Sequence, residues 1–316
     1  MARKLRVEYE GAIYHVMNRG DRREPIFNDD KDRELFLETL GQAAQKTGWQ
    51  VHAYCLMSNH FHLVLETPNP NLVAGMKWFL GTYTGRFNRR HKLFGHLFSG
   101  RYKALMVDGS GDGYLRTVCD YVHLNPVRAK LVHPGQKLGR YRWSSYREYL
   151  RAPGQRPAWM RVGRLLGEMG IPKDSAAGRR QFERMMEARR QLDDPETFKA
   201  LRRGWYLGDK TFRAELLEQM SEKTGVELYG KEQRETDEQR AERIVTEELE
   251  RGGCNETDLS LRPKGDPVKI AVARRLRKET TMTLKWIALR LQMGSWTYVF
   301  NLLAAPRRLN NEEKCK

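Results

Sequence analysis

The sequence predicts an α+β domain over residues 1–150, followed by a mostly helical region. Within the first 150 residues, the apolar pattern switches repeatedly between the two-residue period of strands and the longer period of helices. After residue 150 the pattern is polar and helical, with prolines as interruptions. A chain of 316 residues is long enough for two domains.

The first predicted elements are a strand and a helix. The strand begins at Ile13–Val16, and Asp29 and Asp30 stand where a helix would begin. The apolar residues of this helix recur at helical spacing and share one face: Phe36, Leu40, Ala43 and Ala44.

A β-hairpin is predicted next. Apolar and polar residues alternate from Val51 to Met57, and they alternate again from His60 to Glu66. Only Ser58 and Asn59 separate the two runs, which is typical of a two-residue hairpin loop.

Three further elements complete the first domain. The spacing predicts a helix over about 70–88, a strand over 101–107 and a helix over about 113–124. The last helix ends at Asn125-Pro126, because the residue before a proline is driven out of the helical region.

The charge of the chain indicates a polyanionic partner. Lys and Arg outnumber Asp and Glu by 57 to 40, a formal net charge of +17. Residues 1–76 are close to neutral (9 basic, 10 acidic), whereas residues 77–150 hold 14 basic and 4 acidic side chains and residues 271–310 hold 8 and 1. The concentration of positive charge in two segments favours two nucleic-acid surfaces.

The remaining composition narrows the class of protein. No apolar run is long enough for a membrane span, and no apolar segment follows the basic start of the chain as in a signal peptide. The four cysteines form no CxxC pair, so neither a disulfide framework nor a zinc knuckle is expected. We therefore expect a cytoplasmic protein without a membrane partner.

Two histidines are the first candidates for chemistry. His60 and His62 lie two residues apart on a predicted strand, so both imidazoles point to the same face and can share one divalent cation. The alternative is a pair of histidines on a polar sheet face. The apolar Phe61 and Leu63 on the opposite face favour the first interpretation.

Tyr121 is the second candidate. It lies at the edge of the apolar stripe of the helix at 113–124, and we expect it to flank the core. Asn125 follows one turn later on the same edge. A phenol and an amide oxygen facing two histidines would supply a nucleophile and a third metal ligand. The alternative is an amphipathic tyrosine at the boundary of the core.

Five separated motifs carry a resemblance to a known family. They are YHVMNRGDRREPIF at 14–27, LMSNHFHLVLE at 56–66, HLFSGRYKALMV at 96–107, YVHLNPVRAKLV at 121–132 and YRWSSYREYL at 141–150. Together they resemble the single-tyrosine HUH transposases, and within them the REP-associated tyrosine transposases, relatives of the insertion-sequence enzymes. The resemblance covers about residues 5–150.

The resemblance implies a ferredoxin-like antiparallel sheet with helices and a DNA-nicking and joining enzyme that acts near hairpins of single-stranded DNA. It implies Mg²⁺ or Mn²⁺ bound by His60 and His62, with Tyr121 as the nucleophile. Asn125 stands where the better-described enzymes have a glutamine that completes the metal site. For the general base, His123, His52 and a metal-bound water stay open.

Basic residues near this site are predicted to bind DNA phosphates. They are Lys77, Arg86, Arg89, Arg90, Arg101, Lys103 and Arg128. Four aromatic residues are available either for base stacking or for the core: Tyr83, Phe87, Phe98 and Tyr102.

The C-terminal block is predicted to contain a helix-turn-helix. Asp266-Pro267, Thr283 and Ser295 each stand where a helix would begin, and basic residues flank the block. The third helix would enter a major groove with Trp296, Thr297, Tyr298 and Asn301. Gln292 stands where this turn often has glycine. The alternative is a helical bundle used for packing or dimerisation.

These observations predict three parts: a transposase domain at 1–150, a mixed helical linker region at 151–235 and a helix-turn-helix domain at 236–316. The predicted function is a metal-dependent endonuclease and strand transferase for single-stranded or hairpin DNA, nucleoid-associated, and a monomer or homodimer. The alternative is a non-catalytic DNA-binding regulator built on a degenerate transposase domain.

Overall fold

The computed structural model describes residues 6–192, 201, 204–224 and 231–304. Contacts divide the chain into two compact units, Met1–Tyr229 and Gly230–Lys316, and each is described by itself. The three-part division of the sequence stays a prediction.

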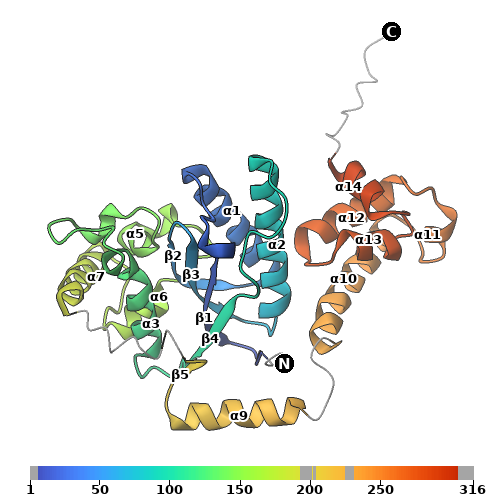
Figure 1. Cartoon of the computed structure of the whole chain (residues 1–316). Coiled ribbons are helices and arrows are strands. Elements are labelled where there is room, and N and C mark those ends of the chain that lie inside the picture. Colours follow the sequence, from blue (N-terminus) through green and yellow to red (C-terminus); the bar gives the residue numbers. More distant parts are fainter. Residues whose placement is uncertain (1–5, 193–200, 202–203, 225–230, 305–316) are drawn as a thin grey trace. The chain divides into compact units, whose positions relative to one another are not determined.

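The first unit is built on a five-stranded sheet (Figure 1). Its strands lie in the order β2-β3-β1-β4-β5. They are β1 (Ala12–Arg19), β2 (Gln50–Leu56), β3 (His60–Thr67), β4 (Lys103–Val107) and β5 (Tyr206–Leu207). The first four strands are antiparallel and have the ferredoxin-like order that was expected.

One strand departs from the prediction of an antiparallel sheet. The two-residue strand β5 pairs in parallel with β4, through Met106 with Tyr206 and Val107 with Leu207. A segment of two residues has no period to detect, and the chain returns to this edge only after a long connection, so the sequence pattern gave no sign of it.

Helices cover both faces of the sheet (Figure 1). α1 (Asp30–Thr47) and α2 (Leu72–His91) cover one face. The other face carries α3 (Tyr114–His123), α5 (Tyr146–Leu150), α6 (Gly163–Glu168) and α7 (Ala176–Arg189). Between α3 and α5 lie α4 (Asn125–Arg128) and the short 3-10 turn η2 (Leu138–Arg140), and α9 (Lys210–Thr224) ends the unit. Further 3-10 turns are η1 (Asp21–Arg23), η3 (Pro153–Gln155) and η4 (Arg190–Leu192).

The alternation of side chains along the strands produces two cores. Tyr14, Val16 and Leu63 face α1 and α2, and the four residues predicted to share one face of α1 are all buried there. Ile13 and Val64 face α3 instead. The Asp29 side chain accepts the backbone N–H of Asp32 and caps α1 as expected.

The predicted hairpin is confirmed. β2 and β3 pair from Gln50 with Glu66 to Leu56 with Phe61, with a bulge at His52. The backbone N–H of Met57 donates to the carbonyl of His60 at 2.9 Å, so Ser58 and Asn59 alone form the loop.

The second unit is helical. It contains α10 (Lys231–Arg251), α11 (Asp258–Leu261), α12 (Pro267–Glu279), α13 (Leu284–Arg290) and α14 (Trp296–Ala304). The caps predicted at Asp266, Thr283 and Ser295 are confirmed, because each side chain accepts a backbone N–H of the following helix. Among the described helices, none has the length and apolar composition of a membrane span.

Candidate active site

The two histidines of β3 face α3. His60 and His62 lie on the same side of the strand as Val64, while Phe61 and Leu63 pack into the core under α1 and α2. The ring centroids of His60 and His62 are 5.1 Å apart. The side chain of His62 is buried and that of His60 is half-buried.

The structure brings Tyr121 to these histidines. Packing of α3 on the sheet places the Tyr121 ring edge-on to His62, with 5.6 Å between centroids. Tyr121 is only 8% exposed, so it enters the core further than its place at the edge of the apolar stripe predicted. His62 and Tyr121, which are far apart in the chain, therefore lie side by side in the candidate site.

Asn125 is the first residue of α4, one turn beyond Tyr121, and it is buried. α3 ends at His123, as the Asn125-Pro126 pair predicted, and Pro126 occupies the first turn of α4, where a missing N–H costs nothing. The role of Asn125 as a metal ligand stays a prediction.

Asn59 fixes the protonation of His60. The Asn59 side-chain amide donates from Nδ2 to the carbonyl of Arg23 at 2.9 Å, so its Oδ1 is the atom that faces His60 Nδ1 at 2.8 Å. An amide oxygen only accepts, so the Nδ1 atom of His60 carries the proton. The Nε2 atom of His60 therefore keeps a free lone pair, as a metal ligand must.

A third histidine that the sequence reading missed contacts both His62 and Tyr121. His15 on β1 places its Nε2 atom 3.0 Å from Nδ1 of His62, and its ring centroid is 5.6 Å from that of Tyr121. Alternation along β1 puts His15 on the same face as Ile13 and Met17. The signal was available in the sequence, but only the pairing of β1 with β3 shows that His15 meets His62.

Burial keeps these histidines neutral. Desolvation lowers the pKa of His15 to about 3 and that of His60 to about 4, and it holds the pKa of His62 well below its ordinary value. The positive charge of Arg19 adds to the effect at His60. Neutral imidazoles at pH 7 are ready to coordinate a cation without first losing a proton.

Basic side chains surround the site. The guanidinium of Arg128 lies over the Tyr121 ring, 4.3 Å from its centroid, and also donates to the Tyr121 carbonyl. Arg19 pairs directly opposite His60, and Lys103 on β4 is opposite Met17, whose other partner is His62. Arg19 is a second residue that the sequence reading missed.

The donor set fits a divalent cation only in part. In the described parts of the chain, no three His, Cys, Asp or Glu side chains gather into a metal-binding group. His60 and His62 have their Nδ1 atoms engaged by Asn59 and His15, which is the arrangement expected of metal-binding histidines. An amide or phosphate oxygen would have to complete the coordination.

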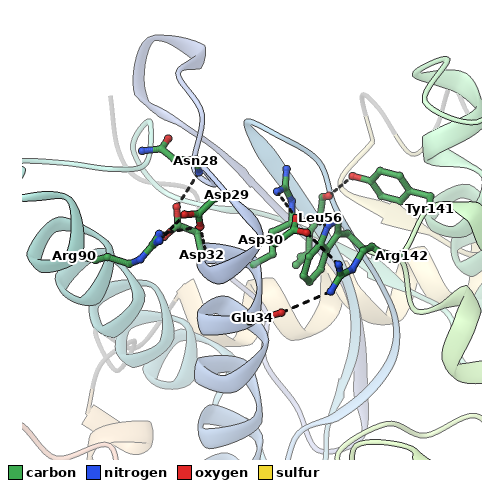
Figure 2. A network of polar contacts seen from close by, with 11 residues as sticks. Asn28, Asp29, Asp30, Asp32, Glu34, Leu56, Arg90, Tyr141 and Arg142 are labelled. Carbon is green, nitrogen blue, oxygen red and sulfur yellow. Dashed lines mark hydrogen bonds and ion pairs between the residues drawn. The ribbon is translucent and has the colours of Figure 1, made fainter.

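Two of the predicted DNA-binding arginines make contacts within the fold. Arg90 donates to the carboxylates of Asp29 and Asp32, and it joins α2 to the first turn of α1 (Figure 2). Arg86 donates to Thr39 Oγ1 and Gln42 Oε1, both at 2.8 Å. Both arginines lie on the α1 and α2 side of the sheet, away from Tyr121.

The other predicted phosphate contacts are at the surface. Lys77, Arg89, Arg101 and Lys103 are exposed. Tyr83, Phe87, Phe98 and Tyr102 are buried in the core under α1 and α2, so the core is the alternative that the structure supports for all four.

His123 and His52 are engaged away from Tyr121. His123 contacts Ser145 Oγ at 2.9 Å and packs against Tyr149. His52 contacts Glu66 Oε2 at 3.1 Å and the carbonyl of Arg161 at 3.2 Å. These contacts make both histidines poor candidates for the base that activates Tyr121.

The predicted recognition helix exposes the expected residues. Trp296 and Tyr298 on α14 are 54% and 41% exposed, and Thr297 and Asn301 are exposed as well. Ile287 and Ala288 of α13 are buried. Gln292 in the turn has a φ of 51°, in the left-handed region that glycine adopts most readily.

Comparison with known proteins gives a family for the first unit. The family model described as "Transposase IS200 like" matches residues 8–125. A search of curated proteins found no match. A solved structure described as "Structure of the REP associates tyrosine transposase bound to a REP hairpin" is 14% identical, covers 50% of this chain and 89% of its own, and has a TM-score of 0.40.

The family match spans β1 to Asn125, and so it contains His60, His62 and Tyr121. At the level of the family, this match confirms the resemblance that the five motifs indicated. Residues 8–125 of this chain are therefore similar to the IS200-like transposases.

Proposed function

We propose that the first unit nicks and rejoins single-stranded DNA near hairpins, with Tyr121 as the nucleophile. The observation that supports this proposal is the contact of the Tyr121 ring with His62, across the interface of α3 with the sheet. A nucleophile next to two neutral histidines, of which His60 has a free Nε2 lone pair, suits metal-assisted cleavage of a phosphodiester.

The step is a transfer of the phosphodiester to the tyrosine. The Tyr121 oxygen forms a bond to phosphorus while the bond from phosphorus to the 3′ oxygen breaks. The phenolic proton leaves, and the released 3′ oxygen takes up a proton to become a hydroxyl. The product is a 5′-phosphotyrosine that retains the phosphodiester energy, so a 3′-hydroxyl can reverse the step without ATP.

His60, His62 and Asn125 would hold Mg²⁺ or Mn²⁺ at this site. When bound, the ion would neutralise charge on a non-bridging oxygen of the scissile phosphate. Arg128, Arg19 and Lys103 surround the same place and add positive charge toward the phosphate.

The second unit is proposed to bind double-stranded DNA through a helix-turn-helix. α14 begins directly after a tight turn and exposes Trp296, Thr297, Tyr298 and Asn301. Aromatic and amide side chains on one exposed helix suit contacts with bases and phosphates in a major groove. A protein with both surfaces would be associated with DNA in the cytoplasm.

One observation favours the alternative of a non-catalytic DNA-binding regulator. Tyr121 is 8% exposed and the guanidinium of Arg128 lies over its ring, so little of this side chain is accessible from outside. An assay for the covalent intermediate separates the two functions.

The test uses the full chain with Mg²⁺ and DNA hairpins that carry single-stranded tails, labelled at the 3′ end. Because the 5′-phosphate joins the tyrosine, the 3′ label is expected on a protein adduct that resists SDS, whereas a 5′ label is expected on a released strand. Tyr121→Phe abolishes the adduct. Tyr114→Phe, at the start of the same helix, is the matched control and retains it.

An adduct that persists in Tyr121→Phe would overturn the mechanism. Absence of any adduct across a wide set of hairpins, with DNA binding intact, would favour the regulator.

A further inference from the structure

A basic hollow lies on the surface of the first unit, outside the candidate active site. It is lined by residues of η2, α5 and α7, among them Lys137, Arg140, Arg147, Arg151 and Glu183. α5 turns Tyr146 and Tyr149 into the core and leaves Arg147 at the surface. The hollow therefore lies on the outer side of the helices that cover this face of the sheet.

Positive charge in the hollow is only partly compensated. Lys137 pairs with Glu183 at 3.3 Å, and Arg151 pairs with Glu148 at 2.9 Å. Arg140 and Arg147 are exposed, and among the described residues the structure gives neither guanidinium a protein acceptor. Like charges gathered around one hollow repel each other, and a bound polyanion would relieve this repulsion.

The wall of the hollow is held in place by α7 and η4. Arg190 donates to the carbonyls of His133 and Gln136, and Glu187 accepts the backbone N–H of Leu138 at 2.8 Å. These contacts fasten the segment that carries Lys137 and Arg140. A surface that is already ordered loses less conformational entropy on binding.

The hollow suits an extended anion better than a small one. Its lining is made largely of the aliphatic stems of long basic side chains and Leu150, and the charged groups of Arg140 and Arg147 stand at the surface. A small anion is normally held by converging donors in an enclosed site, whereas a chain of phosphates is met by separate exposed arginines.

We propose that this hollow, through Arg140 and Arg147, binds the phosphate backbone of DNA beyond the segment that reaches Tyr121. The inference rests on the proposed function, because it assigns a second contact to the same substrate. It also explains why the positive charge of residues 77–150 extends past the candidate site to Arg147.

The test measures equilibrium binding of a fluorescent DNA hairpin with a single-stranded tail, by anisotropy, over a series of salt concentrations. The full chain carries Tyr121→Phe, so that binding is read without cleavage. Arg140→Ala/Arg147→Ala is compared with Lys210→Ala/Arg213→Ala, which removes the same charge from exposed positions on α9. Backbone contacts are independent of sequence, so any hairpin serves as the probe.

Arg140→Ala/Arg147→Ala, the hollow variant, is expected to bind the hairpin about tenfold more weakly at low salt. The slope of log K against log salt is negative, and its magnitude is expected to decrease by about 2. The control pair is expected to leave the slope unchanged. Equal slopes for the two pairs would overturn the inference. If inorganic phosphate at low concentration competes with the hairpin and lowers the slope as the hollow variant does, the hollow is a small-anion site. That result would also overturn the inference.

The result is distinguishable from failure of the proposed function. If no covalent adduct forms with unsubstituted Tyr121 but the slope still falls, the hollow binds DNA and the nuclease proposal is wrong. If the adduct forms and the slopes are equal, only the hollow is wrong.

Discussion

The Nε2 atom of His15 on β1 lies 3.0 Å from Nδ1 of His62 on β3, inside a core that excludes water from both rings. The other ring nitrogen of His15, Nδ1, has no hydrogen-bond partner in the described chain. One proton therefore lies between the two rings, on Nε2 of His15 or on Nδ1 of His62. If His62 is to bind a cation through Nε2, its own proton must lie on Nδ1 and be donated to His15.

Replacing His15 should therefore weaken metal binding. His15→Ala removes the acceptor that holds His62 in the required tautomer, so we expect affinity for Mn²⁺ to fall by roughly 10- to 100-fold. Titration of the protein with Mn²⁺, followed by electron paramagnetic resonance, measures this directly. His123→Ala, another buried histidine on the same side of the sheet, should leave Mn²⁺ affinity unchanged. Equal affinity in both variants would mean that His15 serves packing alone.

Arg128 should assist the reaction even though it covers the nucleophile. Its guanidinium lies over the Tyr121 ring and is placed to meet the scissile phosphate once it moves. We expect Arg128→Ala to slow single-turnover adduct formation by roughly 100-fold. Arg116→Ala, on the outer part of α3, is the control. A faster reaction in Arg128→Ala would show that Arg128 only shields Tyr121.

Arg90 should matter for stability more than for DNA binding. It compensates the fully buried carboxylate of Asp32, so Arg90→Ala leaves a buried charge with fewer partners. We expect a thermal midpoint lower by a few degrees. Arg89→Ala changes an exposed neighbour on the same helix and should leave the midpoint unchanged. If Arg90→Ala keeps the midpoint but weakens DNA binding, the original prediction for this arginine is correct.

Glu66 should make the first unit sensitive to acid. The hydrogen bond from His52, aided by the charges of Arg164 and Arg161, lowers the pKa of Glu66 from 4.5 to about 2. A carboxyl with a lowered pKa in the folded state contributes stability above its ordinary pKa. This contribution is lost as the pH falls from about 4.5 toward 2.

Glu66→Gln should therefore weaken the dependence of the free energy of unfolding on pH between about 4.5 and 2. The variant should be less stable than the original protein at pH 7, and the two should converge near pH 2. Urea unfolding at a series of pH values measures the difference. Parallel curves from pH 7 to pH 2 would contradict the assignment.

The exposed face of α14 should carry duplex binding by the second unit. Thr297→Ala/Asn301→Ala should weaken binding to a duplex selected from a random pool by about tenfold or more, because polar contacts to base edges are lost. The control Asn255→Ala/Thr257→Ala removes the same side chains from another exposed part of the unit. If both pairs bind alike, the helical-bundle alternative is favoured.

Much of the first unit could be predicted from local patterns. The hairpin loop at Ser58-Asn59 and the cap at Asp29 depend on neighbours in the chain, and the structure confirms them. In the second unit, the structure confirms the cap at Thr283 for the same reason. The same holds for the shared face of His60 and His62, because alternation along a strand is fixed by backbone geometry.

Local patterns in the sequence predict most strands and helices of the α+β domain, the face on which each side chain lies, and motifs similar to those of IS200-like transposases. The tertiary structure decided which elements meet. It joined β1 to β3 and so brought His15 to His62, it buried Tyr121 under Arg128, and it turned Arg90 to Asp32. Contacts between residues far apart in the chain depend on how strands pair and helices pack, and no periodicity along one segment encodes them.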